Sequence, residues 1–319
     1  MKTELLNASD PQTIERAAAL LQAGELVVFP TDTLYGLGAN PYDDAAVEAL
    51  YRVKDRSYEK GIPILLAGVA DIGRVARDVS TAAQELLERF WPGPLTLIVP
   101  RQDTLASNIS PNENIAVRIP DDEVAQAIIR AAGGALATTS ANRSGEPPAR
   151  HAAEALQALQ GQVAAVVDGG PVVVGMPSTI VDCTGPLPVV LRPGHVSASD
   201  VTRLTGLALG ESSVVRAPGT LASHYAPTAT VRIVDEDALA AVPADDATTG
   251  VLALAAITTP VGLVRLSAPI DAAEYARVLY AALREADALG LARVLAVPPS
   301  ADGVGAAVID RLQRAAAGS

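Results

Sequence analysis

Short apolar runs alternate with segments of helical periodicity along the first two thirds of the chain. Short runs of consecutive apolar residues are typical of buried strands, and apolar residues three and four positions apart are typical of amphipathic helices. We predict strands at 26–29, 62–66, 95–99, 115–119, 135–139, 163–167, 179–182 and 189–191. We predict helices at 10–24, 45–53, 81–90, 121–131 and 151–159. This alternation predicts an α/β fold in which helices cover a sheet.

The first predicted helix has clear signals at both ends. Asp10 provides a carboxylate N-cap and Pro11 suits the first helical position, so the helix is expected to begin there. Apolar residues between Ile14 and Leu21 recur on one face. Gly24 is a typical helix stop, and we therefore expect one helix between Asp10 and Gly24.

A second alternating unit follows a stretch of weak periodicity at 207–227. In this unit we predict strands at 230–234, 250–254, 262–266 and 294–297, and helices at 272–289 and 303–315. A connection of about 20 residues is long for a simple loop, so it is either flexible or functional. The pattern predicts a larger domain at 1–207, a linker or lid at 208–228 and a smaller C-terminal α/β domain at 229–319.

Composition predicts a chain with a sizeable core and disfavours several classes of protein. Hydrophobic residues make up 49% of the chain and charged residues 19%, so disorder is not expected. The net charge of −12 argues against a broad basic face for nucleic acid. The lone Cys183 excludes an intrachain disulfide and a multi-cysteine metal cluster. Without a signal-like start or a long apolar run, we expect a cytoplasmic protein with no membrane span.

Lysine is rare in this chain, and its positions point to a phosphate site. Only three of the 24 basic residues are lysines, and two of them, Lys54 and Lys60, flank Arg56 just after a predicted helix. An ammonium group is a compact point charge and a guanidinium a planar fork, so together they suit a polyphosphate. A solvated helix end also attracts cations and is the simpler interpretation. The clustering of lysine favours the phosphate site.

Polar groups follow the strand at 26–29 after a single proline, Pro30. Four side chains there can form hydrogen bonds: Thr31, Asp32, Thr33 and Tyr35. Gly36 and Gly38 are expected to turn the chain. These groups exceed what a simple turn needs, and ligands in open α/β sheets bind at strand ends. We therefore expect a binding loop here.

Other strands also run into polar residues. Ser140 and Asn142 follow the strand at 135–139 and can hold an anion through hydroxyl and backbone N–H groups. Arg118 lies within an apolar strand, where it either pairs with an internal acid or faces a cleft, and we favour the cleft. Ser178 precedes one strand and Arg192 follows another. We expect these strand ends to meet in one cavity.

Several familiar chemistries are absent from the sequence. There is no P-loop motif, Gly36-Leu-Gly38 lacks the third glycine of a dinucleotide fingerprint, and no Gly-x-Ser-x-Gly elbow occurs. The three histidines show no metal spacing. One tryptophan and two phenylalanines leave no platform for stacking single-stranded nucleic acid.

Seven motifs carry a family resemblance. In chain order they are Pro-Thr-Asp-Thr-x-Tyr-Gly-Leu-Gly, Lys-x-Arg, Trp-Pro-Gly-Pro-Leu-Thr, Val-Arg-Ile-Pro, Ser-Ala-Asn-x-Ser-Gly, Ser-Thr-Ile-Val-Asp and Leu-Arg-Pro-Gly. This set resembles the YrdC-like family, specifically its two-domain threonylcarbamoyl-adenylate synthases, over about residues 10–205. The stretch 217–227 resembles that family's linker. The resemblance implies a large twisted open sheet flanked by helices, joined by a long linker to a smaller Rossmann-like domain.

The resemblance also implies an activity. L-threonine, bicarbonate or CO2, and ATP would give threonylcarbamoyl-AMP and pyrophosphate, the first step of threonylcarbamoyladenosine formation in tRNA. The product would pass to the tRNA threonylcarbamoyl-transfer machinery, without a stable nucleic-acid complex. Mg²⁺ would be carried by the ATP phosphates, because no carboxylate cage for a metal is visible in the sequence.

Site residues are carried over motif by motif. Residues implied at the threonine and carbamate end are Thr31, Thr33, Tyr35, Arg118, Thr139 and Ser178. Residues implied in nucleotide binding are Lys54, Arg56, Ser140, Asn142, Arg192, His224 and Tyr225. Those implied in catalysis itself are Thr31, Thr33, Tyr35, Lys54 and Arg56. His224 and Tyr225 would cover the site from the linker.

Two other functions compete with this interpretation. YrdC-like domains have been linked with RNA, so a non-catalytic RNA-binding module is one alternative, which the acidic charge disfavours. A carbamoyltransferase-type domain that uses carbamoyl phosphate is another. Such proteins usually carry extra zinc-binding cysteines, which Cys183 alone cannot supply.

Overall fold

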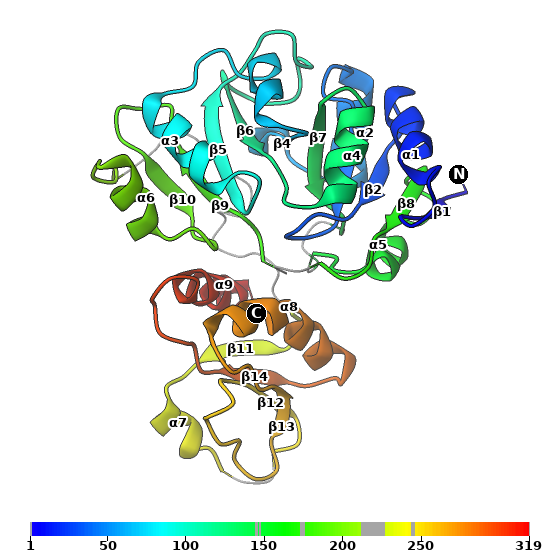
Figure 1. The fold of residues 1–319 in the computed structure, drawn as a ribbon. Helices are drawn as coiled ribbons and strands as arrows, with labels where there is room; N and C mark the ends of the chain where they lie inside the picture. Colours follow the sequence, from blue (N-terminus) through cyan, green and yellow to red (C-terminus); the bar gives the residue numbers. More distant parts are fainter. Residues whose placement is uncertain are drawn as a thin grey trace. The chain divides into compact units, whose positions relative to one another are not determined.

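The computed structural model describes two compact units, each considered by itself (Figure 1). The described residues of the first unit are 2–143, 148–172 and 176–211, and those of the second are 227–243 and 246–318. Residue 146 is also described. Of the helices in this part of the chain, none is long and apolar enough to cross a membrane.

The first unit is built on a ten-stranded mixed sheet with the order β1-β8-β2-β3-β7-β4-β6-β5-β9-β10. Its strands are β1 (Glu4–Asn7), β2 (Val27–Phe29), β3 (Gly36–Ala39), β4 (Ile64–Leu66), β5 (Leu95–Pro100), β6 (Asn114–Arg118), β7 (Ala135–Ser140), β8 (Ala165–Asp168), β9 (Thr179–Asp182) and β10 (Val189–Arg192). Its helices are α1 (Thr13–Gln22), α2 (Asp44–Val53), α3 (Thr81–Phe90), α4 (Glu123–Ala131), α5 (Ala152–Leu159) and α6 (Ala198–Thr205), with 3₁₀ turns η1 (Tyr58–Lys60) and η2 (Val69–Arg74).

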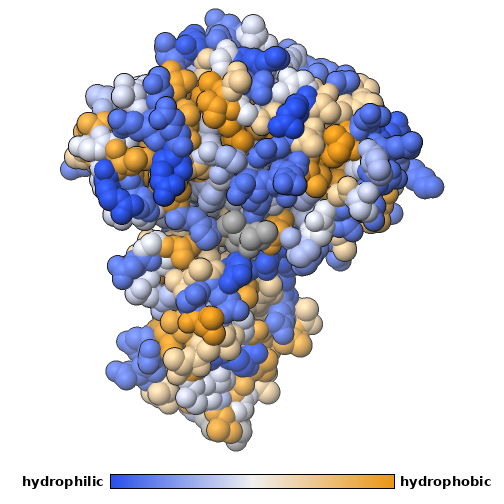
Figure 2. Space-filling model, in the orientation of Figure 1, coloured by the Kyte–Doolittle hydropathy of each residue, from blue (hydrophilic) through white to orange (hydrophobic). Residues whose placement is uncertain are grey.

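Helices cover the two faces of this sheet unequally. The larger core joins one face to α2, α3, α5 and α6. On the other face, α1 and α4 pack against β8, β2, β7 and β4. Further along that face, β6, β5 and β9 carry Arg118, Thr96 and a small apolar cluster around Ile98 and Ile180. Arg118 and Thr96 belong to the polar clusters described below. On the visible side of the first unit, hydrophilic residues separate small hydrophobic patches (Figure 2).

The predicted start of the first helix is wrong. α1 begins at Thr13, and Gln12 occupies the N-cap position. The Asp10 carboxylate instead accepts a hydrogen bond from the Gln12 N–H at 2.9 Å, and the Thr13 N–H donates to the Asp10 carbonyl at 3.0 Å. Asp10 and Pro11 therefore form a tight turn before the helix, a conformation that competes with capping in Asp-Pro sequences.

The two glycines expected to turn the chain belong to strand β3. A Cβ atom at Gly38 would lie 2.6 Å from the Phe29 ring, and one at Gly36 would lie 2.8 Å from the Thr138 methyl group. Glycine is needed here because a neighbouring ring crosses the strand at close range. The same packing explains why β3 was not predicted, since its sequence lacks the β-branched residues that mark strands.

The second unit has a four-stranded parallel sheet with the order β11-β14-β12-β13. Its strands are β11 (Thr230–Ile233), β12 (Thr249–Leu252), β13 (Val264–Ser267) and β14 (Arg293–Ala296), and its helices are α7 (Glu236–Ala240), α8 (Ala272–Ala288) and α9 (Gly305–Gly318). This is the smaller C-terminal α/β domain that the sequence predicts, and all of its strand pairs are parallel. The short helix α7 is an addition to that prediction.

An acidic group joins two strands of the second unit. Asp246 accepts hydrogen bonds from the hydroxyl groups of Thr248 and Thr249, each at 2.7 Å, and forms an ion pair with Arg293 of β14. The two hydroxyl groups, followed by Arg293, hold the pKa of the Asp246 carboxyl far below its usual range. A carboxylate of this kind stabilises the fold only while it is charged.

Replacing Asp246 with asparagine should therefore change the acid sensitivity of the second unit. Stabilisation by the carboxylate is complete above its unfolded-state pKa of about 4 and is lost as the pH falls towards the lowered folded-state value. We expect Asp246→Asn to weaken the protection of the β12 and β14 amides against hydrogen exchange at neutral pH. Below about pH 4, this protection should fall less steeply in the variant than in the unmodified chain. Hydrogen exchange on the full chain measures this, with Asp235→Asn at the α7 N-cap as control. Identical pH profiles for Asp246→Asn and the unmodified chain would contradict the prediction.

Candidate active site

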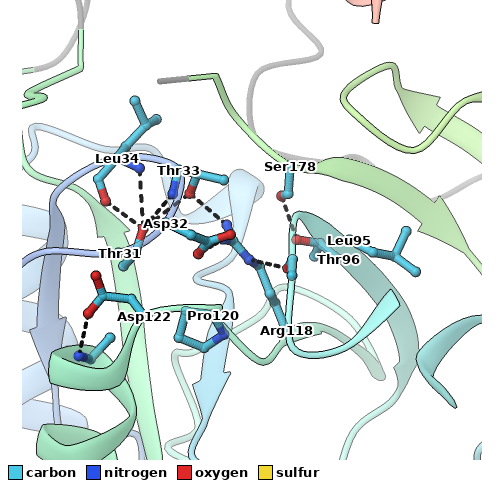
Figure 3. Close-up of polar contacts among 12 residues, drawn as sticks. Thr31, Asp32, Thr33, Leu34, Leu95, Thr96, Arg118, Pro120, Asp122 and Ser178 are labelled. Carbon is cyan, nitrogen blue, oxygen red and sulfur yellow. Dashed lines mark hydrogen bonds and ion pairs between the residues drawn. The ribbon is translucent and has the colours of Figure 1, made fainter. Parts of the chain in front are cut away.

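The loop between β2 and β3 is held by its own hydrogen bonds. The Thr31 hydroxyl donates to the Leu34 carbonyl at 2.6 Å and accepts from the N–H groups of Thr33 and Leu34 at 3.3 and 3.2 Å. Its oxygen also lies 3.1 Å from the Thr33 hydroxyl. Figure 3 shows this loop beside the end of β6. The turn fixes the directions in which Asp32 and Thr33 project.

Arg118, the last residue of β6, is the centre of the first polar cluster. Its Nε donates to the Gly93 carbonyl at 2.9 Å, Nη1 donates to the Thr33 hydroxyl at 2.7 Å, and Nη2 forms an ion pair with Asp32 (Figure 3). The side chains of Arg118 and Asp32 are only 7% and 6% exposed. The preference for an open cleft over an internal acid is therefore wrong, because the β2–β3 loop brings Asp32 onto the guanidinium.

A second cluster lies on the neighbouring strands. Leu97 of β5 pairs with Val117 of β6, which places Thr96 beside Arg118. The Thr96 and Ser178 hydroxyl oxygens are 2.7 Å apart. Arg192 donates through Nη2 to the Ser178 carbonyl at 2.9 Å and to its hydroxyl at 3.2 Å. Ser178 and Arg192, predicted separately from the sequence, are thus in direct contact.

A third cluster unites three of the residues implied in nucleotide binding. Lys54 follows α2 as its C-cap and is 5% exposed. Its ammonium group donates to the Ser140 carbonyl at 2.8 Å, to the Asn142 side-chain oxygen at 3.0 Å and to the Asn142 carbonyl. Arg56 lies nearby in sequence but is directed at the η1 turn, with bonds to the carbonyls of Lys60 and Gly61 at 3.2 and 2.8 Å.

Tyr35 connects the β2–β3 loop with the third cluster. Its carbonyl accepts a hydrogen bond from the Ala141 N–H at 2.8 Å, between Ser140 and Asn142. Its side chain is fully buried, and the hydroxyl donates to the Gly170 carbonyl at 2.7 Å. Burial raises the pKa of Tyr35 to about 12, so the phenol stays protonated. The structure therefore places Tyr35 in the core, behind the loop that Thr31 and Thr33 form.

The structure thus brings most of the predicted residues together in three polar clusters, whereas Arg56 is directed at the η1 turn and Tyr35 lies in the core. Thr139 lies in β7, one residue before Ser140, and is buried. His224 and Tyr225 lie outside the described residues. The functional roles of all these residues remain predictions.

The sequence analysis placed Asp32 in the expected binding loop but gave it no role in the site, and it did not single out Thr96. Asp32 had one signal, its place between two threonines in the predicted binding loop. The signal for Thr96 was its alternation with buried Leu95 and Leu97, which puts its side chain on the same sheet face as Arg118.

Among the described residues, no group of three or more His, Cys, Asp or Glu side chains is placed to hold a metal ion. Cys183 is buried, and burial raises the pKa of its thiol to about 12. A thiol with so high a pKa is a poor nucleophile at neutral pH. The chemistry that the clusters offer is therefore charge neutralisation and hydrogen bonding by arginine, lysine and hydroxyl groups.

The fold and the clusters together define an α/β protein suited to anionic substrates, with a smaller parallel α/β unit after the main sheet. Comparison with protein families agrees. The family described as "Telomere recombination", which comprises Sua5, YciO and YrdC, matches residues 19–194, and "Threonylcarbamoyl-AMP synthase, C-terminal domain" matches residues 190–317. The chain belongs to this Sua5/YciO/YrdC family and has the additional C-terminal domain.

Named relatives cover most of the chain. The threonylcarbamoyl-AMP synthase of Bacillus subtilis is 37% identical over 73% of this chain and 69% of its own length. That of Pyrococcus abyssi is 32% identical over 95% of this chain and 93% of its own length. A solved structure, P. abyssi Sua5 in complex with L-threonine, superposes with a TM-score of 0.87 at 31% identity, covering 99% of this chain and 98% of that one. These matches confirm the predicted fold class and the family resemblance.

Proposed function

We propose that this chain is a threonylcarbamoyl-AMP synthase that forms threonylcarbamoyl-AMP and pyrophosphate from L-threonine, bicarbonate or CO2, and ATP. The observation that carries the proposal is the match of both domains, in order, to relatives of that name over nearly the whole chain. The P. abyssi relative has been solved with L-threonine bound. This family match favours the enzyme over a non-catalytic RNA-binding module.

The reaction makes one demand that the site is suited to meet. The ammonium group of threonine first loses a proton to water, and the neutral amine then bonds to the carbon of CO2 and loses a second proton, which gives a carbamate. A carbamate oxygen then attacks the α-phosphorus of ATP, the bond from that phosphorus to the bridging oxygen of pyrophosphate breaks, and pyrophosphate leaves. The carbamate and ATP are both anions, so catalysis requires charge neutralisation and in-line positioning. No nucleophile from the protein takes part.

Arg118 is proposed to bind the threonine carboxylate. A guanidinium has five N–H donors, and the three bonds to Gly93, Thr33 and Asp32 use three of them. Two donors remain for a ligand, in a site where water is largely excluded. Thr31, Thr33 and Ser178 would supply hydroxyl groups at the threonine and carbamate end. Such buried, charge-assisted hydrogen bonds are stronger than neutral ones.

Lys54 is proposed to bind the ATP phosphates, with Ser140 and Asn142 in contact with it. Arg56 and Arg192 are proposed to bind the nucleotide as well. The ammonium group of Lys54 already meets three acceptors, so a phosphate oxygen would replace one of them. The Asn142 amide is the acceptor that can rotate away, because the other two are backbone carbonyls. Mg²⁺ would arrive with the ATP phosphates. The adenylate product would then be consumed by transfer of its threonylcarbamoyl group to tRNA.

Pyrophosphate release tests the proposed function. The purified chain is assayed with ATP and Mg²⁺ and with threonine, serine or no amino acid, each with and without bicarbonate. We expect release only when an amino acid and bicarbonate are both present, and at least about 10-fold less with serine, which lacks one methyl group. Mass spectrometry should find threonylcarbamoyl-AMP. ATP turnover at the same rate with and without threonine would contradict the proposal. RNA binding that weakens steeply with increasing salt would support the RNA-binding module instead.

A further inference from the structure

Asp32 carries a buried oxygen atom that its surroundings leave unused. Its Oδ1 forms the ion pair with Arg118, whereas Oδ2 is buried and has no hydrogen-bond partner. The side chain is 6% exposed. A buried carboxylate oxygen without a donor is unfavourable, and native structures contain few such groups without a functional or structural reason. A ligand that donates a hydrogen bond at this position would remove the penalty.

The donors and acceptors around Asp32 match the two charged groups of an amino acid. Arg118 keeps two N–H groups beyond its three observed bonds. The unpartnered Oδ2 of Asp32 belongs to the same carboxylate that Arg118 binds through Oδ1. An α-amino acid presents a carboxylate and an ammonium group on the same carbon atom. A paired arginine and aspartate can therefore bind both charges, each against its opposite. The self-bonded loop around Thr31 keeps Asp32 in place.

We propose that Asp32 binds the α-ammonium group of the substrate through Oδ2, while Arg118 binds its carboxylate. This inference rests on the proposed function and deepens it, since it assigns the amine end of the threonine site. It makes Asp32 a substrate-binding residue in addition to the counterion of Arg118. The site would then discriminate against molecules that have the carboxylate and hydroxyl of threonine but no amine.

A ligand that lacks only the amine separates the two roles of Asp32. L-threonine and (R)-3-hydroxybutanoate share the carboxylate, the hydroxyl and the methyl group. Ligand-observed NMR and calorimetry give their dissociation constants for the unmodified chain and for Asp32→Asn, in which Oδ1 can still accept from Arg118. We expect threonine affinity to fall at least about 10-fold, while that of (R)-3-hydroxybutanoate changes less than about 3-fold. An equal loss for both ligands would mean that Asp32 acts only by holding Arg118, and would overturn the proposal.

Asp122 provides a matched control. Its carboxylate accepts from the Ala125 N–H at 2.8 Å at the start of α4, a bond that asparagine can also accept (Figure 3). Burial and, to a smaller degree, the negative charge of Asp32 raise the pKa of Asp122. Asp122→Asn should leave both dissociation constants within about 3-fold of the parent. A threonine loss as large as that of Asp32→Asn would contradict the assignment to Asp32.

A second measurement needs no variant. NMR titration of ¹⁵N-labelled threonine bound to the unmodified chain gives the pKa of its α-amino group. An ammonium group held by a carboxylate should have a pKa above that of free threonine, and an unchanged or lower value would overturn the proposal. The proposed function and the proposed role of Asp32 can be refuted separately. Absence of threonine binding and threonine-dependent pyrophosphate release in the unmodified chain would refute the proposed function itself. Normal turnover with equal ligand losses in Asp32→Asn would refute only the role of Asp32.

Discussion

Replacing Arg118 with methionine is expected to destabilise the first unit by about 3–5 kcal/mol and to abolish threonine-dependent pyrophosphate release. The ion pair with Asp32 is buried on both sides, so the variant leaves an uncompensated carboxylate in the interior. The Gly93 carbonyl and the Thr33 hydroxyl also lose a charged donor. Methionine fills a similar volume, so the loss reports on charge and hydrogen bonding more than on packing.

Trp91 makes the stability measurement specific to this unit. It is the only tryptophan of the chain and lies in the core of the first unit, so its fluorescence follows the unfolding of that unit alone. Urea titrations at neutral pH give the free energy of unfolding. The double variant Arg118→Met with Asp32→Asn removes both charges and should recover about 2 kcal/mol or more relative to the single variant. If the single and double variants unfold alike, the buried charge is not the source of the effect.

The contrast between Lys54 and Arg118 shows what the sequence could predict about the site. Ser140 and Asn142 follow a strand whose apolar run is plain, and Lys54 ends a helix of clear periodicity, so their meeting at strand ends was foreseeable. The partner of Arg118 was not. Asp32 is 86 positions away in the sequence, and only the path of the β2–β3 loop decides whether it meets the guanidinium.

Elements without strong local signals were missed for three different reasons. The edge strand β1 (Glu4–Asn7) alternates partly buried and exposed residues over only four positions, too few for a periodicity. α6 buries little besides Val201, so its apolar pattern is weak, although Ser197 and Asp200 form a capping box at its start. β3 depends on the Phe29 ring that crosses its glycines, a tertiary contact that no local pattern reveals. Long elements with a buried face, such as α3, were predicted to the residue.

Replacing Lys54 with alanine is expected to reduce pyrophosphate release at least about 100-fold under saturating threonine and bicarbonate. The ammonium group donates hydrogen bonds to Ser140 and Asn142. The variant therefore loses a cation that would bind the phosphates and also the hydrogen bonds that order residues 140–142. Both the KM for ATP and kcat should be affected, because the lost charge would act on bound and reacting phosphates alike. Lys54→Arg should recover little, since a planar fork cannot direct three donors at acceptors arranged around a point charge.

Lys60 gives this prediction its control, because it is a second lysine in the same short segment. It ends the η1 turn at a half-buried position, and of its own atoms only the backbone carbonyl accepts a hydrogen bond from Arg56. Lys60→Ala should therefore keep turnover within about 3-fold of the parent, whereas a general effect of positive charge near the nucleotide would lower both variants in parallel. Trp91 fluorescence identifies the fraction of each protein that is folded. Folded Lys54→Ala protein that releases pyrophosphate at the parental rate would show that Lys54 organises residues 140–142 without binding ATP.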